Sequence, residues 1–176
     1  DISVPRIDSK STGKGHKDFE VKLGKGITLT QDQLRRDFWM NAMARDVETG
    51  EIHDIDKKGQ TDIENKQIRV IGSQAFKEDP LRMLRAVQFA ARFDFTIETE
   101  TMKQIKKNVN LIKTVSAERF QEEFKKMFEK GTPSVGVDLL HQTGILKKLF
   151  PRARDTFSVE YDKLDKKGFP AFLAVL

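Results

Sequence analysis

The sequence predicts an α+β fold in which a mixed part with strands and a helix is followed by an all-helical part. Short runs that alternate apolar and polar residues, as strands do, precede residue 73. From Ser73 onward, apolar residues recur at the three- and four-residue spacing of helices. We therefore expect three segments, at residues 1–72, 73–150 (all-α) and 151–176.

Composition indicates a globular, water-soluble protein. Hydrophobic residues make up 38% of the 176 residues and charged residues 34%, and 13 Phe against one Trp and one Tyr predict a core built on phenylalanine. The absence of Cys excludes disulfides and thiolate metal sites. With no apolar run of membrane length and no signal peptide, we expect a cytoplasmic protein without membrane contact. The net charge of +5 favours a polyanionic partner, although excess lysine serves solubility equally well.

The first part is expected to combine strands, one helix and loops. Thr30 can supply the side-chain oxygen that caps the helix. The elements expected in order are strands at 1–6 ("DISVPR") and 18–23 ("DFEVKL"), a helix at 31–46, a turn and short strand at 49–55, a loop at 56–62 ("DKKGQTD"), and a second strand or helix-to-strand transition at 65–72.

The second part is expected to consist of helices joined by turns. Pro133 and Gly144 mark turn positions in this part of the chain, and the signals after Pro151 are mixed. The helices are expected at 78–93, about 97–108, 116–130 and about 133–148.

The stretch "EDPLRMLRAVQFAARF" at 78–93 combines a core-facing stripe with a charged ridge. Asp79 before Pro80 is typical of a helix start, so Asp79 and the neighbouring Glu78 can act as caps alone. Asp79, Arg82 and Arg85 follow at three-residue spacing and share one face of the helix. The face expected to be buried contains Leu81, Leu84, Val87 and Ala91.

An aspartate beside an arginine on this ridge can recognise a flat group that offers a donor next to an acceptor. Carboxylate oxygens accept hydrogen bonds, and a guanidinium only donates them. Adenine and cytosine present an amine beside an unprotonated ring nitrogen, whereas guanine and uracil present a carbonyl beside an N–H. Asp79 and Arg82 are therefore predicted to accept A and C and to reject G and U. The alternative is an ion pair between Asp79 and Arg82.

A second polar cluster lies in "RRDFWMNAMA" at 35–44 and suits the sugar and phosphates of a nucleotide. Arginine matches phosphate oxygens, and aspartate with asparagine can address ribose hydroxyls. The alternative is an ordinary solvated helix face of mixed charge. Phe38 and Trp39 are expected in the core rather than as platforms for a base. The cluster consists of Arg35, Arg36, Asp37 and Asn41.

These two stretches and "SAERFQEEFKKM" at 116–127 resemble, in order and spacing, three motifs of the family of class II tRNA nucleotidyltransferases and bacterial poly(A) polymerases. The segments "ISVPRIDSKSTGKGHKDFEV" and "LLHQTGILKKLFP" resemble the regions that flank those motifs. The resemblance covers about residues 1–151. It implies the C-terminal part of a polymerase β-like nucleotidyltransferase head domain over 1–72, an all-α neck domain for base recognition over 73–150, and the start of a body domain over 151–176.

The resemblance implies a transferase that processes tRNA. Such an enzyme adds CMP and AMP to tRNA 3′ ends from CTP and ATP without a template (CCA addition), and it uses Mg²⁺. The RNA 3′ hydroxyl attacks the α-phosphate of the nucleotide, and pyrophosphate leaves. A poly(A) polymerase and a non-catalytic module that binds RNA or nucleotides remain alternatives, as does a purely structural helical domain.

The family's motifs also imply roles for individual side chains. The positions of Asp79 and Arg82 pair with the base, and that of Asp37 lies near the sugar. Supporting positions brace the helix that recognises the base. The residues implied to bind nucleotide are Arg36, Asp37, Asn41, Asp79, Arg82 and Arg85. The supporting residues are Arg35, Glu78, Glu118 and Arg119.

The sequence departs from the family pattern at the metal site. The first motif, a Gly-Gly loop followed by an Asp-x-Asp pair that holds magnesium, has no match here and would lie upstream of Asp1. We therefore expect no catalytic residue and no metal ligand in this chain, and we expect the chain alone to be inactive. Asp54 and Asp56 in "DIDKKGQTD" match the third motif, a flexible element, rather than a metal pair.

Other positions carry weaker signals. Gln88 stands where the family usually has an arginine, which removes one phosphate-binding charge. His16, His53 and His141 lack the neighbouring ligands of a metal or phosphohydrolase site. Arg92 receives no role.

Overall fold

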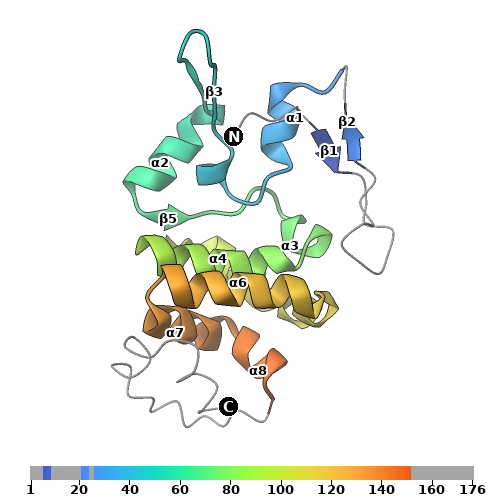
Figure 1. Ribbon diagram of the computed structural model, residues 1–176, viewed down its shortest axis with the longest axis vertical. Helices are drawn as coiled ribbons and strands as arrows, with labels where there is room; N and C mark the ends of the chain where they lie inside the picture. Colours follow the sequence, from blue (N-terminus) through green and yellow to red (C-terminus); the bar gives the residue numbers. More distant parts are fainter. Residues whose placement is uncertain (1–5, 9–20, 24–25, 152–176) are drawn as a thin grey trace.

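The structure is a computed structural model that describes residues 6–8, 21–23 and 26–151 (Figure 1). A mixed part with short strands lies against an all-helical part, and helix α4 (Leu81–Phe93) lies at their junction. On one side α4 contacts the strands near residue 68, and on the other it packs along α6 (Ala117–Lys130) and α7 (Pro133–Thr143). The α+β fold class is confirmed.

The first strands form an antiparallel pair. β1 (Arg6–Asp8) pairs with β2 (Val21–Leu23). Strand β2 coincides with the last three residues of the strand predicted at 18–23, whereas β1 shares only Arg6 with the strand predicted at 1–6 and extends beyond it; the other residues of both predicted strands lie outside the described part of the chain.

The helix predicted at 31–46 with Thr30 as its cap is wrong in both respects. Helix α1 spans only Leu29–Leu34, and its cap is Thr28, which forms a capping box with Gln31. The backbone then becomes extended at Phe38, which bridges to Val70 and lies wholly inside the core. Burial of this aromatic ring on a strand-like segment therefore outweighs the helical period of the sequence.

A hairpin and a short helix follow. β3 (Ala44–Arg45) pairs antiparallel with β4 (Ile52–His53) across a turn in which the Asp46 carboxylate accepts the N–H groups of Glu48 and Thr49. The loop predicted at 56–62 is wrong. After a 3-10 turn at Ile55–Lys57, helix α2 spans Lys58–Glu64.

Two local features explain why α2 is helical. The Asp54 carboxylate accepts the N–H groups of Gly59 and Gln60 at 2.9 and 2.8 Å, so it satisfies the start of the helix. Gly59 lies so close to the backbone at Trp39 that a Cβ on residue 59 would be 2.8 Å from the Trp39 carbonyl oxygen. The glycine therefore permits contact between α2 and the turn at Trp39–Asn41 (η1).

The strand expected at 65–72 is present only as β5 (Gln67–Ile68), which pairs in parallel with β6 (Thr96–Ile97). Strand β6 was not predicted, because two residues are too few to show the alternation of apolar and polar residues that indicates a strand. This pair joins the chain before α4 to the chain after it.

The helical character predicted for the second part is confirmed, although the helix predicted at 78–93 begins only at Leu81 and Glu78 belongs to the preceding short helix. Gly144, with φ of 78°, separates α7 from α8 and so divides the helix predicted at 133–148. The helices are α3 (Ala75–Glu78), α4 (Leu81–Phe93), α5 (Thr99–Asn108), η3 (Val109–Thr114), α6 (Ala117–Lys130), α7 (Pro133–Thr143) and α8 (Ile145–Leu149).

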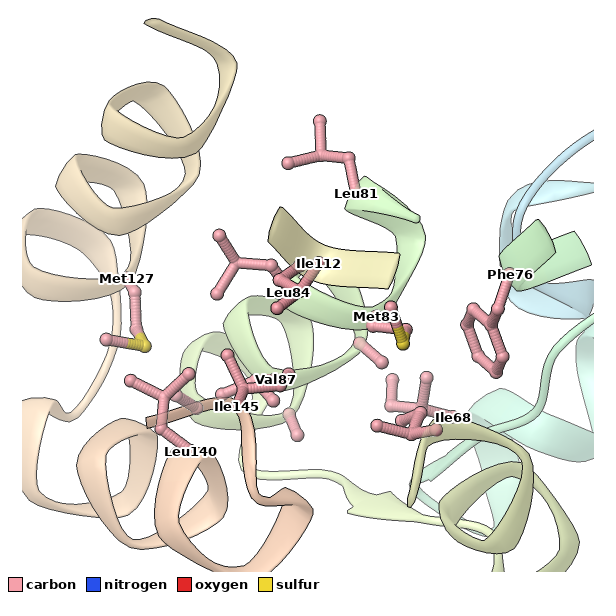
Figure 2. Packing of buried hydrophobic residues seen from close by; sticks show 14 of the residues in the cluster. Ile68, Phe76, Leu81, Met83, Leu84, Val87, Ile112, Met127, Leu140 and Ile145 are labelled. Carbon is pink, nitrogen blue, oxygen red and sulfur yellow. The ribbon is translucent and has the colours of Figure 1, made fainter. Parts of the chain in front are cut away.

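One continuous core surrounds α4 (Figure 2). Leu84 and Val87 lie close to Met127, Leu140 and Ile145 of the following helices. On the other side, Met83 lies toward Ile68 and Phe76. The predicted buried face of α4 is confirmed, since Leu81, Leu84, Val87 and Ala91 are buried.

Phenylalanine contributes to this core without dominating it. Phe38 and Phe76 are fully buried, Phe124 and Phe128 are buried in α6, and most of the other core residues are aliphatic. Phe93 is exposed at the end of α4. In the part of the chain that the structure describes, no helix combines the length and apolarity required to cross a membrane.

Replacing Glu98 by Gln should lower the free energy of unfolding by about 0.5 to 1 kcal/mol at neutral pH. The Glu98 carboxylate caps α5 by accepting the N–H and hydroxyl of Thr101 at 2.6 and 2.8 Å. Burial raises the pKa of Glu98, but these hydrogen bonds outweigh burial and hold the pKa below its ordinary value of 4.5. Because the folded-state pKa is depressed, the stabilisation is present above the ordinary value and is lost as the pH falls through the depressed one.

Urea unfolding at neutral and acidic pH measures this effect. The control is Glu100→Gln in the same first turn, where an exposed carboxylate pairs with Lys103 at 3.3 Å. Equal losses in the two variants, or a Glu98 effect that persists in acid, would contradict the capping account.

Candidate nucleotide-binding site

The predicted cluster at 35–41 is organised by Asp32, a buried residue of α1. Its Oδ1 accepts Arg35 Nε at 2.9 Å, and its Oδ2 accepts Arg36 Nη2 at 3.0 Å. Arg36 Nη1 donates to the Asn41 carbonyl oxygen at 3.0 Å, and Arg36 Nε is buried without a partner among the described residues. Sequence reasoning missed Asp32, although its three- and four-residue spacing to the two arginines is a usable signal.

Asp37 is the most fully bonded member of the cluster. Its Oδ1 accepts the Phe38 N–H at 2.9 Å and Asn41 Nδ2 at 3.0 Å. Its Oδ2 accepts Arg85 Nε at 2.8 Å and lies 2.7 Å from Arg85 Nη2. Asn41 thus holds Asp37, and the cluster at 35–41 is joined directly to the ridge of α4.

Arg85 lies between two carboxylates. Besides Asp37, its Nη1 is 3.5 Å from Glu123 Oε1, and its guanidinium lies 5.0 Å from the Phe89 ring centroid. Burial of the guanidinium lowers the pKa of Arg85, but the charge and hydrogen bonds of Asp37, followed by the charges of Glu123 and Asp79, outweigh burial and raise it. Arg85 is therefore permanently charged, and its side chain is only 30% exposed.

Asp79 and Arg82 are each held by another element. Asp79 Oδ1 accepts the Leu81 N–H at 3.1 Å, as an N-terminal cap does, and Asp79 Oδ2 accepts Arg119 Nη2 at 2.8 Å. Arg82 Nη2 donates to the Arg35 carbonyl oxygen at 2.6 Å, and Nη1 lies 3.7 Å from the exposed Glu78 carboxylate.

The alternative of an ion pair between Asp79 and Arg82 is therefore wrong for the described part of the chain, where each has a different charged partner. The hypothesis of a purely structural helical domain required that pair. Asp79 lies in the junction between α3 and α4, and Arg82 lies in the first turn of α4.

The remaining predicted residues lie farther from this arrangement. Glu118 is exposed in the first turn of α6, and hydrogen bonds from its own backbone N–H and from Ser116 lower its pKa. Arg92 is exposed in the last turn of α4, with its guanidinium 4.9 Å from the Phe93 ring centroid. Gln88 is 1% exposed, and its Nε2 has no partner among the described residues, so this amide does not face solvent.

The described residues do not fit a magnesium site. No group of three or more His, Cys, Asp and Glu side chains within the described ranges could hold a metal ion. Asp54 caps α2, and Asp56 pairs with Lys58 at 2.8 Å. His141 is exposed on α7, and His16 lies outside the described residues.

The chain matches two family profiles. The profile described as "Poly A polymerase head domain" matches residues 1–69, and the profile described as "Probable RNA and SrmB-binding site of polymerase A" matches residues 94–156.

Curated relatives have similar sequences. The chain is 40% identical over 165 residues to the "Multifunctional CCA protein" of Shewanella denitrificans, covering 90% of this chain and 39% of that protein. It is 36% identical over 166 residues to the "CCA-adding enzyme" of Pseudomonas entomophila, covering 91% and 43%. The chain thus spans about two fifths of the length of these relatives.

Solved structures are similar as well. The Thermotoga maritima CCA-adding enzyme complexed with tRNA matches with a TM-score of 0.72 at 29% identity, over 95% of this chain and 44% of that one. The Bacillus stearothermophilus CCA-adding enzyme in complex with CTP matches with a TM-score of 0.66 at 35% identity, over 71% and 31%.

The fold and the two profiles place the chain in the nucleotidyltransferase class, with similarity to a head domain at 1–69 and to a probable RNA-binding region at 94–156. The cluster at 35–41 lies within the residues that the head-domain profile matches, and α4 lies between the two profile matches. The chain belongs to the family of CCA-adding enzymes and poly(A) polymerases.

Replacing Arg119 by Met should lower the free energy of unfolding by about 1 kcal/mol, because it leaves Asp79 Oδ2 without its charged partner where the Asp79 side chain is only 19% exposed. The matched control is Lys125→Met on the same helix, since Lys125 is 71% exposed and its pair with Glu129 is 3.7 Å long. The control should change stability by less than about 0.5 kcal/mol. Denaturant unfolding measures both variants, and equal losses would refute a specific bond between α6 and Asp79.

Proposed function

We propose that this chain provides the nucleotide-selecting part of a template-independent RNA nucleotidyltransferase that adds CMP and AMP to tRNA 3′ ends from CTP and ATP. Relatives named CCA-adding enzymes, some solved with tRNA, CTP or ATP, support this proposal. The central observation is that Asp79, just before α4, and Arg82, in its first turn, are anchored by Arg119 and by the Arg35 carbonyl rather than by each other.

This anchoring leaves both groups able to bind a base. A carboxylate can accept about four hydrogen bonds, and Asp79 receives two in the structure. A guanidinium has five N–H groups, and Arg82 uses Nη2 and, more weakly, Nη1. An acceptor and a donor side by side match the amine and ring nitrogen of adenine or cytosine. Guanine and uracil would place a carbonyl against the carboxylate, and a site of this kind rejects such mismatches.

The cluster at 35–41 is proposed to bind the sugar and phosphates. Arg36 is suited to phosphate because its side chain carries a guanidinium and is 33% exposed. Asp37 and Asn41 are proposed to lie near the ribose. Arg85 is already shared between two carboxylates, so its contact with nucleotide would be made while it still holds Asp37.

The nucleotidyl transfer step is assigned to no described residue. Transfer from a nucleoside triphosphate requires charge neutralisation on the phosphates, which magnesium supplies when bound. Magnesium use, the head, neck and body boundaries at 1–72, 73–150 and 151–176, and a cytoplasmic location remain parts of this proposal.

Poly(A) addition is the second candidate. The matching family profiles are both described in terms of poly(A) polymerase. The two activities differ in product, because CCA addition consumes CTP as well as ATP, whereas poly(A) addition consumes ATP alone.

Calorimetric titration should show that the chain binds ATP and CTP and discriminates against GTP and UTP. Arg82→Ala and Asp79→Asn should each weaken ATP and CTP binding by about tenfold or more, which corresponds to about 1.4 kcal/mol for a charged hydrogen bond. Arg92→Ala is the matched control, because Arg92 lies on the same helix but is exposed and contacts Phe93. It should bind ATP and CTP as the unmodified chain does.

Equal binding of all four nucleotides, or undiminished binding by both Asp79→Asn and Arg82→Ala, would refute base recognition by this ridge. Extension of a tRNA that lacks its 3′-terminal nucleotides, with CTP, ATP or both, then separates CCA addition from poly(A) addition. Extension by purified 1–176 with magnesium would also contradict the expectation that the chain alone is inactive.

A further inference from the structure

Glu123 is a buried carboxylate with an incomplete set of partners. Its side chain is 4% exposed, its Oε1 accepts Lys126 Nζ at 2.8 Å and lies 3.5 Å from Arg85 Nη1, and its Oε2 has no partner among the described residues. Removing a carboxylate from water is unfavourable unless its oxygens are paired, and buried ion pairs often stabilise less than apolar side chains of similar size. Stability alone therefore does not account for Glu123.

The packing of α6 does not depend on this carboxylate. The helix buries Phe124, Met127 and Phe128 in the core, and these apolar side chains fix its position along α4. What Glu123 adds is a negative charge on the side of Arg85 away from Asp37. Asp37 is in the segment at 35–41, and Glu123 is in α6, so Arg85 joins two regions that are distant in sequence.

The distances show that the two carboxylates hold Arg85 unequally. Asp37 Oδ2 receives Nε and Nη2 at 2.8 and 2.7 Å, whereas Glu123 Oε1 lies 3.5 Å from Nη1. Lys126 binds the same Glu123 oxygen at 2.8 Å and is partly exposed. The result is a row of alternating charges in the order Asp37, Arg85, Glu123 and Lys126.

We propose that Glu123 is a positioning residue for nucleotide binding. It contacts Nη1 of Arg85 on the side opposite Asp37, so that Nε and Nη2 face Asp37. The segment at 35–41 thereby stays aligned with the base-recognition ridge of α4. Glu123 itself does not touch the nucleotide. The part of this proposal that concerns nucleotides rests on the proposed function, whereas the part that concerns Arg85 and Asp37 does not.

A positioning role for Glu123 predicts a specific pattern of nucleotide affinities. Base selection is assigned to Asp79 and Arg82, neither of which bonds to Glu123 in the structure. Removing the charge of Glu123 should therefore weaken the binding of ATP and of CTP by the same factor. The preference for these two nucleotides over GTP and UTP should stay unchanged.

The first experiment needs no nucleotide. Nitrogen-15 NMR of the full chain follows the Arg85 Nε–H signal, assigned by its loss in Arg85→Lys, in the unmodified chain and in Glu123→Gln. Glutamine preserves the shape of the side chain and removes its charge. We expect the signal to shift and its exchange with water to become about threefold to tenfold faster, the change that corresponds to one ordinary hydrogen bond. Glu122→Gln, at the exposed neighbouring position of α6, should leave the signal unchanged.

An Arg85 Nε–H signal that is the same in Glu123→Gln and in the unmodified chain would overturn the proposal. A shift of equal size in Glu122→Gln would overturn it too, because the effect would then reflect helix charge in general.

The second experiment titrates ATP, CTP, GTP and UTP into the same variants. ATP and CTP should bind about threefold to tenfold more weakly to Glu123→Gln, with their ratio unchanged. A purely structural role would lower the melting temperature and leave these affinities unchanged at temperatures where the variant is folded, and that result overturns the nucleotide part. A changed ATP to CTP ratio also overturns it, because Glu123 would then act through the base. If the Arg85 signal shifts but no nucleotide binds to any variant, the proposed function fails while the positioning of Arg85 by Glu123 stands.

Discussion

The ion pair between Asp37 and Arg85 is the interaction on which the arrangement of the site depends. It joins residues 48 positions apart and is partly buried, so each charge compensates the other where contact with water is reduced. Asp37 also accepts two hydrogen bonds from its own segment, and its backbone carbonyl receives the Ile71 N–H. A single residue, through its carboxylate and its backbone carbonyl, thus connects the turn at 35–41, the segment after β5, and α4. Networks whose members are all bonded hold one geometry, whereas partly bonded ones do not.

Helix α4 holds its charged side chains in fixed positions because it is packed on most of its circumference. Its buried residues face the strands on one side and α6 and α7 on the other, which leaves a narrow ridge with Arg82, Arg85 and Phe89 partly exposed. Side chains that project from a fixed helix lose little further freedom when a ligand binds, so more of their hydrogen-bond energy contributes to affinity. The same packing fixes Arg82, one of the two residues proposed to recognise the base, on an element of the core rather than on a loop.

The sequence predicted the second part of the fold better than the first for a physical reason. Helices such as α4 and α6 bury a continuous stripe of apolar side chains, so the spacing of apolar residues within each segment predicts the helix. At 31–46 the period also looked helical, yet Phe38 is buried by an extended bridge to Val70, a contact that no local pattern reveals. The charged ridge was found from spacing on one helix. Glu123 was not found, because its contact with Arg85 is made between α6 and α4, which are distant in sequence.

Gln88 can be interpreted together with the row of charges formed by Asp37, Arg85, Glu123 and Lys126. It stands where the family usually has an arginine, and its burial means that the exchange removes a charge from the interior rather than from a solvent-facing phosphate site. Among the described residues, Gln88 Nε2 on α4 is a donor without an acceptor, and Glu123 Oε2 on α6 is an acceptor without a donor. An arginine at 88 would bring a second cation to the helix that already offers Arg85. With glutamine there, Arg85 is the α4 cation that Glu123 contacts, and the charges along the row stay balanced.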